Sequence, residues 1–460
     1  MRLVIRLLAV ALLVALAGAG TFFLLYGRDG EPERFSDDTE HFKYGSIGAE
    51  VNGYPYIVWR TLPHLFPDRA PKGWGTFGFY QEPGRVLPVG VSVRKYGIPR
   101  VGFNCGTCHT STVNGVKDII LGAPANKVDL GAYLQFLTGT ATDPRFTPDN
   151  ILAAPSEQKG GIGWLDRIVY RYFIIPKLVS TLRQVAADNR WRDSRPPQGP
   201  GRTDAGNSWR LRFQMHPEAD QAVGTTDFPS LWNQQIRTHA WLHWDGNNRS
   251  LNERNLSAAL AGGATEESLD HAAIERVAAW SMTAPPPQYP FPIDSKLATA
   301  GEAVYLARKC GACHDPGGPS YGKVTPIGDI GTDRQRLDLF SESLLSKFAT
   351  VGQGRPWQFH NYRKSDGYAN TALDGIWARG PYLHNGSVPT LFDLLATPGE
   401  RPNTFFRGCD TFDPERVGFV CTDGFAFDTG RPGNSSGGHL YGTDLTLTER
   451  HALIEYLKTK

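Results

Sequence analysis

A pair of Cys-x-x-Cys-His motifs constrains this 460-residue chain more than any other feature, one at residues 105–109 and one at residues 310–314. Two thiols and an adjacent imidazole at this spacing suit haem c, because the thiols form thioether bonds to the vinyl groups and the imidazole ligates the iron. Zinc would need further Cys or His pairs, and the sequence has none at suitable spacing. We therefore expect two covalent haems c, with these cofactor-binding residues: Cys105, Cys108, His109, Cys310, Cys313 and His314.

The N-terminus predicts export from the cytoplasm. Arg2 and Arg6 precede an apolar run over residues 7–26, which Arg28 closes. A positive segment before a long apolar run is typical of a signal peptide or a membrane anchor. Because about 20 residues suffice to span a bilayer, residues 1–28 are read either as a cleaved signal or as an uncleaved inner-membrane anchor. Both readings place the body of the protein in the periplasm or outside the cell.

The charge balance excludes one class of partner. The chain has 48 basic and 46 acidic residues, so its formal net charge is +2. This balance provides no basic field for phosphates, and nucleic acid is not an expected partner.

The two cysteines outside the motifs, Cys409 and Cys421, either close a short disulfide in an oxidising compartment or stay unlinked as small buried side chains. The disulfide is the favoured reading.

A proline-rich stretch divides the chain into two predicted domains. Residues 284–292 carry five prolines in nine positions, which forbids a helix and favours an extended linker. We expect an N-terminal haem c domain over residues 41–283 and a C-terminal class I-like cytochrome c domain over residues 293–460. The predicted fold class is mainly α, with two cytochrome c-like haem domains, long ordered loops and an elaborated N-terminal domain.

Local patterns predict several elements around the motifs. Residues 297–309 form an amphipathic pattern that runs into the second motif, and residues 446–449 have the spacing of a capping box before a final helix. Residues 97–104 contain two glycines and a proline, which argues against a helix. Residues 164–185 are apolar with interspersed Arg and Lys, and Pro176 should break or kink that helix. Core or pocket packing is favoured there over contact with a membrane surface.

The sixth iron ligand decides whether a haem transfers electrons or reacts. The only methionines are Met1, Met215 and Met282, so the second haem has no downstream thioether ligand. Of the later histidines, His439 is favoured because it ends a Gly-rich stretch that can fold over a haem face, and His384 is next. Four residues follow the first motif as candidates, none of them favoured: Met215, His216, His239 and His243. An iron without a strong sixth ligand is free to bind dioxygen or peroxide.

Several longer stretches resemble the bacterial di-haem cytochrome c peroxidases and their relatives, including the secreted rubber oxygenases. They are Arg100 to Cys105, Asp227 to Asn233, Leu242 to Asn248, Ala378 to Leu391 and the terminal pattern around His439. The whole pattern looks closer to the rubber oxygenase branch. The resemblance implies a reactive N-terminal haem and a C-terminal haem that accepts or stores electrons, with His109 and His314 as proximal ligands and His439 as the distal ligand of the second iron.

The same resemblance assigns three aromatic residues to the site. Trp244 matches a tryptophan that lies between the haems in the peroxidases, and Phe228 and Trp232 are candidates for an apolar pocket wall. Their alternative role is ordinary aromatic packing. Calcium is a further candidate ion, for which the sequence names no ligands.

We predict a periplasmic di-haem oxidoreductase whose first haem activates peroxide or dioxygen. Its partners would be a redox protein or a small-molecule oxidant, with an apolar alkene as a candidate substrate. The distal His and Glu arrangement of peroxidases is not found, which argues against peroxidase activity, and the short chain argues against polyisoprene as substrate. The alternative is a non-catalytic di-haem electron carrier.

Overall fold

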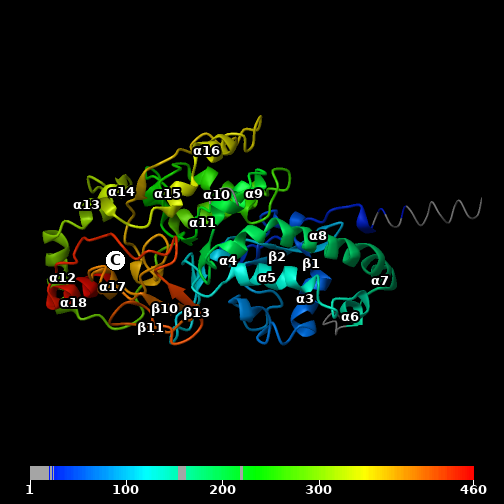
Figure 1. The fold of residues 1–460 in the computed structure, drawn as a ribbon, viewed down its shortest axis with the longest axis horizontal. Helices are drawn as coiled ribbons and strands as arrows, with labels where there is room; N and C mark the ends of the chain where they lie inside the picture. The colour runs from blue at the N-terminus through cyan, green and yellow to red at the C-terminus, as the bar shows by residue number, and fades with distance from the viewer. Residues whose placement is uncertain (1–19, 21–22, 24, 154–161, 218–220) are drawn as a thin grey trace, which may run out of the picture.

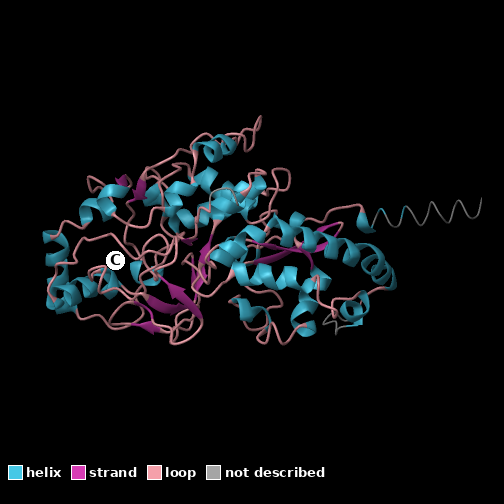
Figure 2. Ribbon diagram, in the orientation of Figure 1, coloured by secondary structure: helices cyan, strands magenta, loops and turns pink. Residues whose placement is uncertain are grey.

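The computed structural model describes residues 20, 23, 25–153, 162–217 and 221–460. The molecule is elongated, with the first part of the chain at one end and the last part at the other (Figure 1). Helices and long loops prevail over strands (Figure 2). The predicted signal or anchor lies mostly outside the described residues, and none of the helices within them has the length and apolar character needed to cross a membrane.

The first part of the chain carries ten α-helices among its described residues, together with short helical turns and strands. The helices are α2 (Asp38–Tyr44), α3 (Tyr56–Leu65), α4 (Cys105–Cys108), α5 (Leu130–Thr140), α6 (Pro148–Ala153), α7 (Trp164–Val169), α8 (Ile175–Asp188), α9 (Ala205–Arg212), α10 (Leu251–Ala261) and α11 (His271–Thr283). The turns are η1 (Ala49–Asn52), η2 (Gly73–Phe77), η3 (Tyr170–Ile174), η4 (Arg190–Ser194) and η6 (Gln234–Arg237). The strands are β1 (Tyr54–Pro55), β2 (Val91–Tyr96), β3 (Ile98–Phe103), β4 (Thr110–Ser111), β5 (Ile120–Leu121), β6 (Arg202–Thr203) and β7 (Thr226–Asp227).

A three-stranded antiparallel sheet leads into the first motif. Its order is β1-β3-β2, with Val101 opposite Tyr54 on one side and Phe103 opposite Val91 on the other. Strand β3 ends at Phe103, and the Asn104 side chain then caps α4 by accepting a hydrogen bond from the Gly106 N–H. The prediction that no helix precedes the first motif is confirmed, because this stretch is a strand.

The apolar segment around Pro176 is one helical run interrupted by a widened turn. Helix α7 continues through η3 into α8, and Ile175 N–H donates to the Tyr170 carbonyl, five residues back. Proline lacks an N–H and crowds the preceding turn, so a π-type turn beside Pro176 accommodates it without ending the helix. One face, including Tyr170 and Leu178, packs in the core, as the sequence favoured.

The second part of the chain has shorter elements. Its helical segments are α12 (Ser295–Ala307), α13 (Gly311–His314), α14 (Ile327–Ile330), α15 (Gln335–Leu339), α16 (Glu342–Phe348), η7 (Ile376–Arg379), α17 (Leu391–Leu394) and α18 (Leu447–Leu457). Its strands are β8 (Val324–Pro326), β9 (Gly367–Ala369), β10 (Thr404–Arg407), β11 (Phe412–Asp413), β12 (Gly418–Phe419) and β13 (Phe425–Asp428).

Helices α12 and α18 pack closely against each other beside the second motif. Gly301 makes the approach feasible, since a Cβ atom there would lie 1.8 Å from the Ala452 carbonyl oxygen. The rings of Tyr305 and Tyr456 extend the contact at 5.3 Å between centroids. The predicted capping box is confirmed, because Thr446 and Glu449 bond reciprocally at the start of α18.

The hydrophobic cores cross the predicted domain boundary. Residues 284–292 run without a helix or strand, and Tyr289 packs edge-on against Trp377 at 5.6 Å. Trp232 belongs to the same buried cluster as Trp377, and Trp209 shares another cluster with Phe348. The two parts therefore share buried surface, and the boundary itself stays a prediction.

Candidate haem sites

The first motif presents its histidine in the form that ligates iron. His109 follows α4 directly, and its Nδ1 lies 2.9 Å from the Pro229 carbonyl oxygen. A carbonyl only accepts hydrogen bonds, so Nδ1 carries the proton and donates it, which leaves the Nε2 lone pair for a metal. Burial, together with the nearby charge of Arg254, lowers the pKa of His109 to about 3. The imidazole is therefore neutral at physiological pH, as iron ligation requires.

The second motif repeats this arrangement on α13. His314 Nδ1 donates to the Thr371 carbonyl oxygen at 2.8 Å, so its Nε2 is likewise left for a metal. Burial lowers the pKa of His314. The cysteines of both motifs, Cys105, Cys108, Cys310 and Cys313, are half-buried thiols outside any disulfide. The donors at both motifs thus fit the thioether and imidazole chemistry of haem c.

His439 lies opposite His314 at a separation that suits an iron between them. The two ring centroids are 6.4 Å apart. Two imidazoles on one iron have ring centres about 6 Å apart, because each metal–nitrogen bond adds about 2 Å and each ring nitrogen lies about 1 Å from its ring centre. Burial, followed by the charge of His314, lowers the pKa of His439 to about 4, and its buried Nδ1 has no hydrogen-bond partner among the described residues.

Glycine and a backbone hydrogen bond position His439. Gly438 has φ +75°, and a Cβ there would lie 2.3 Å from the Gly331 backbone. His439 itself has φ +48°, which is uncommon for a residue with a side chain, and its N–H donates to the Ile330 carbonyl at 2.8 Å. The Gly-rich stretch therefore folds back to the face opposite His314, as its composition predicts.

His384, the second choice for this ligand, has a different environment. Its Nε2 lies 3.0 Å from the hydroxyl of Tyr368, and the two rings stack at 4.0 Å. The Tyr368 hydroxyl donates its proton to the Asp333 carbonyl, so His384 Nε2 carries a proton and donates to the hydroxyl oxygen. Because that nitrogen is occupied by a proton, the geometry favours His439 over His384.

The distal side of the first motif differs from that of the second. His216 and His239 are exposed, and Met215 packs against the cluster around Phe348. His243 is the remaining candidate, and its Nδ1 lies 2.6 Å from the Asn247 side-chain oxygen. Burial lowers the pKa of His243 to about 4. Within the part of the chain that the structure describes, no imidazole pairs with His109 as His439 pairs with His314.

The three aromatic residues predicted for the site lie in three different settings. Phe228 is buried and meets the His109 ring edge-on, with centroids 6.2 Å apart. Trp232 is fully buried, and its Nε1–H donates to the Asp374 carbonyl at 3.0 Å. Trp244 is half-buried and donates from Nε1 to the Asp227 carbonyl at 2.7 Å. Only Phe228 contacts a predicted ligand directly.

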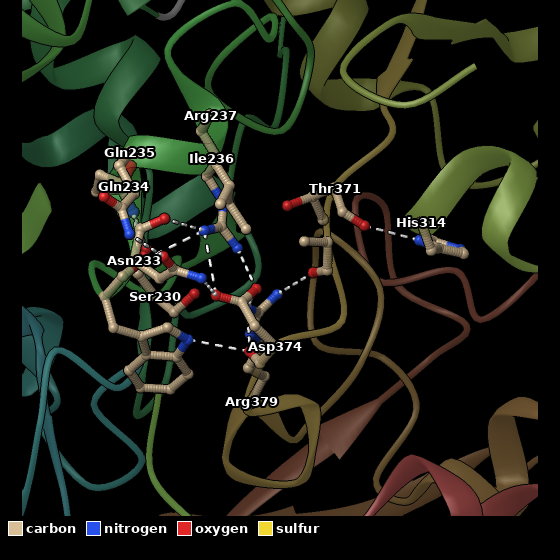
Figure 3. Close-up of polar contacts among 12 residues, drawn as sticks. Ser230, Asn233, Gln234, Gln235, Ile236, Arg237, His314, Thr371, Asp374 and Arg379 are labelled. Carbon is tan, nitrogen blue, oxygen red and sulfur yellow. Dashed lines mark hydrogen bonds and ion pairs between the residues drawn. The ribbon is translucent and has the colours of Figure 1, made fainter. Parts of the chain in front are cut away.

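A buried ion cluster joins the two loops that hold the proximal histidines. Pro229, the partner of His109, begins a loop whose Arg237 donates to Asp374 at 2.5 Å (Figure 3). Thr371, the partner of His314, lies three residues before Asp374. Arg379 bonds the same carboxylate at 2.6 Å. The side chains of Arg237, Arg379 and Asp374 are only 9%, 10% and 12% exposed, so two nearly buried guanidiniums share one carboxylate.

Sequence reasoning missed this cluster although part of its signal was present. Arg379 lies in one of the family-like stretches, but no role was assigned to it, and Asp374 precedes that stretch by four residues. A third cation, Arg254, lies in the same region. Its charge lowers the pKa of His109, and the charge of Arg237 lowers the pKa of Arg254. Arg237 and Arg379 share one carboxylate, and Arg254 lies near Arg237, so the region carries surplus positive charge that would suit the carboxylates of a haem.

The two remaining cysteines form the expected disulfide. Cys409 and Cys421 are bonded, and the bridge closes a loop beside the β10–β13 ladder. Asn126 of the first part of the chain donates to the Cys409 carbonyl at 3.0 Å, so this loop also helps to hold the two parts together.

For calcium, the described residues contain no group of three or more His, Cys, Asp or Glu side chains placed to hold a metal ion.

Comparison with known proteins places one segment in a family. A family model described as RoxA-like, cytochrome c-like matches residues 367–406. This segment contains the Thr371 carbonyl, Asp374 and His384. The chain is also similar to two uncharacterized proteins of Sinorhizobium fredii, strain NBRC 101917 / NGR234.

The two relatives align over different extents. The protein y4iM is 33% identical over 46% of this chain and 53% of its own length. The protein y4iJ is 27% identical over 85% of this chain and 82% of its own length. The chain thus spans about half of the first relative, and neither name states an activity. The matched RoxA-like segment and the donors at the two Cys-x-x-Cys-His motifs together indicate a c-type cytochrome.

Proposed function

We propose that this chain is a periplasmic di-haem c-type oxidoreductase, in which peroxide or dioxygen reacts at the first motif and electrons are exchanged at the second. The observation that carries the proposal is the difference between the distal sides. His439 faces His314 at 6.4 Å, whereas His109 has no such imidazole among the described residues. The fold would comprise two cytochrome c-like haem domains, divided near residues 284–292, within the wider di-haem peroxidase superfamily.

The residues of the first site would hold the haem and leave one side accessible. Cys105 and Cys108 would carry the thioether bonds, and His109 would ligate the iron with its orientation fixed by the Pro229 carbonyl. A haem with an open coordination position supplies dioxygen or peroxide chemistry when bound. Phe228 excludes water from one side of His109, and this apolar contact favours retention of the neutral imidazole.

The residues of the second site would serve electron transfer. Two imidazoles, His314 and His439, would hold the second iron, and a haem held by two strong ligands would supply electron transfer rather than reaction with a substrate. Trp244 is proposed to lie between the haems, and its Nε1–H is fixed by the Asp227 carbonyl. The electron partner would be a redox protein or a small-molecule oxidant.

An apolar cavity beside β3 supports an apolar substrate such as an alkene. Its volume is about 410 Å³, and Val101, Phe103 and Leu178 are among the side chains that line it. Phe103 lies two residues before Cys105, so the cavity adjoins the strand that leads into the first motif. Cavities of this size and character suit small apolar molecules.

The deciding experiment counts open coordination positions and then tests turnover. An alkaline pyridine spectrum of the matured protein should show two haems c per chain. The reduced protein should bind one carbon monoxide per two haems, and either peroxide with a reduced donor or dioxygen with an alkene should be turned over. His109→Gly should abolish turnover while the low-spin spectrum of the second haem persists. Two low-spin haems that bind no carbon monoxide would contradict the proposal.

One observation favours a non-catalytic electron carrier as the second candidate. His243 is held neutral by burial, and Arg254 influences the pKa of both His243 and His109, so these residues occupy one region. If His243 ligated the first iron, both haems would be six-coordinate. His243→Ala would then convert one low-spin haem into a high-spin haem, whereas the catalytic proposal expects no such change.

A further inference from the structure

The helical run from α7 through η3 into α8 has an apolar face that nothing within the described residues covers. This face carries four exposed side chains, which are Trp164 (74% exposed), Ile168 (43%), Tyr172 (66%) and Phe173 (63%). Three of them recur at every fourth position, so they form one stripe along the helix. The opposite face is buried in the core through residues such as Tyr170 and Leu178. The stripe is therefore not a poorly packed part of the core but a separate outward surface.

Basic side chains accompany this stripe. Arg167, Lys177 and Arg183 are exposed on the same helical run, and Arg171 lies beside Tyr172. Two contacts moderate the charge: Arg171 pairs with Asp149, and Arg167 donates to the Leu152 carbonyl. Trp and Tyr are enriched at the depth of lipid headgroups, and neighbouring Lys and Arg bind anionic lipids. Aromatic residues with basic flanks on one helix are typical of a helix that lies in a membrane interface.

The N-terminal apolar run ends beside the same helix. The Tyr26 hydroxyl donates to an Asp166 carboxylate oxygen at 2.6 Å, and Gly30 N–H donates to the Lys95 carbonyl at 2.8 Å. In Figure 1 the start of the described chain, in dark blue, lies next to α7 at one end of the molecule. The described end of the apolar run, which is predicted as signal or anchor, thus lies beside the helix that carries the stripe.

We propose that Trp164, Ile168, Tyr172 and Phe173 form a lipid-facing stripe that rests in the interface of an anionic bilayer. The stripe and the end of the apolar run share one end of the molecule, so both can contact one membrane surface at once. A second copy of the chain is a poorer occupant. A symmetric contact would bring the basic flanks of two copies together, and that repulsion opposes association.

Photo-crosslinking of the full haem-loaded protein tests this proposal. p-Benzoylphenylalanine replaces Phe173, and the protein is illuminated with vesicles of phosphatidylethanolamine and phosphatidylglycerol. The matched control carries the same group in place of Phe406, which is 39% exposed in the second part of the chain. We expect about tenfold more phospholipid adduct from position 173 than from position 406. A covalent dimer through position 173, or equal adduct at both positions, would overturn the proposal.

A second variant tests whether the aromatic side chains cause the contact. The probe is placed at Ile168, and Trp164, Tyr172 and Phe173 are changed to serine, written W164S, Y172S and F173S. Lipid adduct at position 168 should fall about tenfold relative to the same probe without the three changes. The spectra of both haems should be unchanged, which shows that the fold is retained. Undiminished adduct in a folded triple variant would refute a role for the stripe, and the Phe173 probe decides the matter if that variant does not fold.

Discussion

The two candidate haem sites share one side and differ on the other. On the proximal side, His109 and His314 each donate from Nδ1 to a backbone carbonyl, at 2.9 and 2.8 Å. On the distal side, His314 has an opposed imidazole, that of His439, and His109 has none within the described part of the chain. The shared side holds the ligand in a fixed tautomer, and the differing side sets whether a coordination position stays open. The same local motif can therefore serve two chemical roles, because residues far away in the sequence complete each site.

The largest expected effect comes from making the second site like the first. His439→Ala removes the distal imidazole, so the second haem should change from low-spin to high-spin in an electron paramagnetic resonance spectrum, and the reduced protein should bind a second carbon monoxide. His439→Met should keep six ligands and raise the reduction potential by about 100 mV or more. These outcomes are measured by spectroscopy and by redox titration.

The control for this prediction is another histidine of the same region. His451 lies exposed on α18, where its ring contacts Phe392 at 5.4 Å. His451→Ala should leave the spectrum and the potential unchanged. A low-spin spectrum that persists in His439→Ala would show that another residue ligates the second iron, and the contrast between the two sites would need a different explanation.

The sequence predicts the parts of this contrast that depend on short spacing. The two Cys-x-x-Cys-His motifs, the capping box at Thr446 and the strand before Cys105 all involve neighbours within a few residues, so local chemistry decides them. The absence of a methionine after Cys313 excludes a downstream thioether ligand, and the Gly-rich stretch before His439 then favours that histidine over His384. The favoured disulfide between Cys409 and Cys421 is present. It could be predicted because the two cysteines lie only 12 positions apart.

The sequence does not predict the parts that depend on tertiary contact. The carbonyl partners of the proximal histidines come from Pro229 and Thr371, which lie 120 and 57 positions away, and any residue type can offer a carbonyl. Asp374 likewise meets Arg237 across 137 positions. The sequence favours core packing over a membrane surface for residues 164–185, whereas Trp164 is exposed, because an apolar periodicity does not tell a core from a lipid surface.

The next largest effect concerns the ion cluster that joins the two proximal loops. Asp374→Asn keeps the shape of the side chain but removes the negative charge that Arg237 and Arg379 share, and these two side chains are 9% and 10% exposed. Leaving buried cations without their partner typically costs about 3–5 kcal/mol in the free energy of unfolding. Chemical denaturation followed by circular dichroism measures this loss.

An exposed ion pair provides the matched control. Arg334 and Asp338 pair at 2.9 Å with 60% and 46% of their side chains exposed. Asp338→Asn should cost only about 0–1 kcal/mol, because water screens that pair. Equal losses from the two variants would show that the Asp374 cluster does not couple the proximal loops to the stability of the fold.

A smaller effect should appear as a pH dependence near the second site. Burial lowers the pKa of His384 to about 3, whereas an unfolded histidine titrates near pH 6.5. Below that pH the unfolded chain binds a proton that the folded chain does not, so the free energy of unfolding falls as the pH decreases from about 6.5 toward 3. His384→Asn should reduce this slope by about 1.4 kcal/mol per pH unit. An unchanged slope in His384→Asn would show that burial does not keep this imidazole neutral in the folded chain.

The smallest effect tests whether His384 is held away from the iron by Tyr368. The Tyr368 hydroxyl accepts from His384 Nε2 at 3.0 Å and donates to the Asp333 carbonyl. Tyr368→Phe keeps the stacked ring but removes both hydrogen bonds, at a cost of about 1–3 kcal/mol in the free energy of unfolding. The haem spectrum should not change, because His439 rather than His384 faces His314. A new low-spin species in Tyr368→Phe would mean that the freed His384 competes for the iron, and the distal side of the second site would then be set by that hydrogen bond as well as by His439.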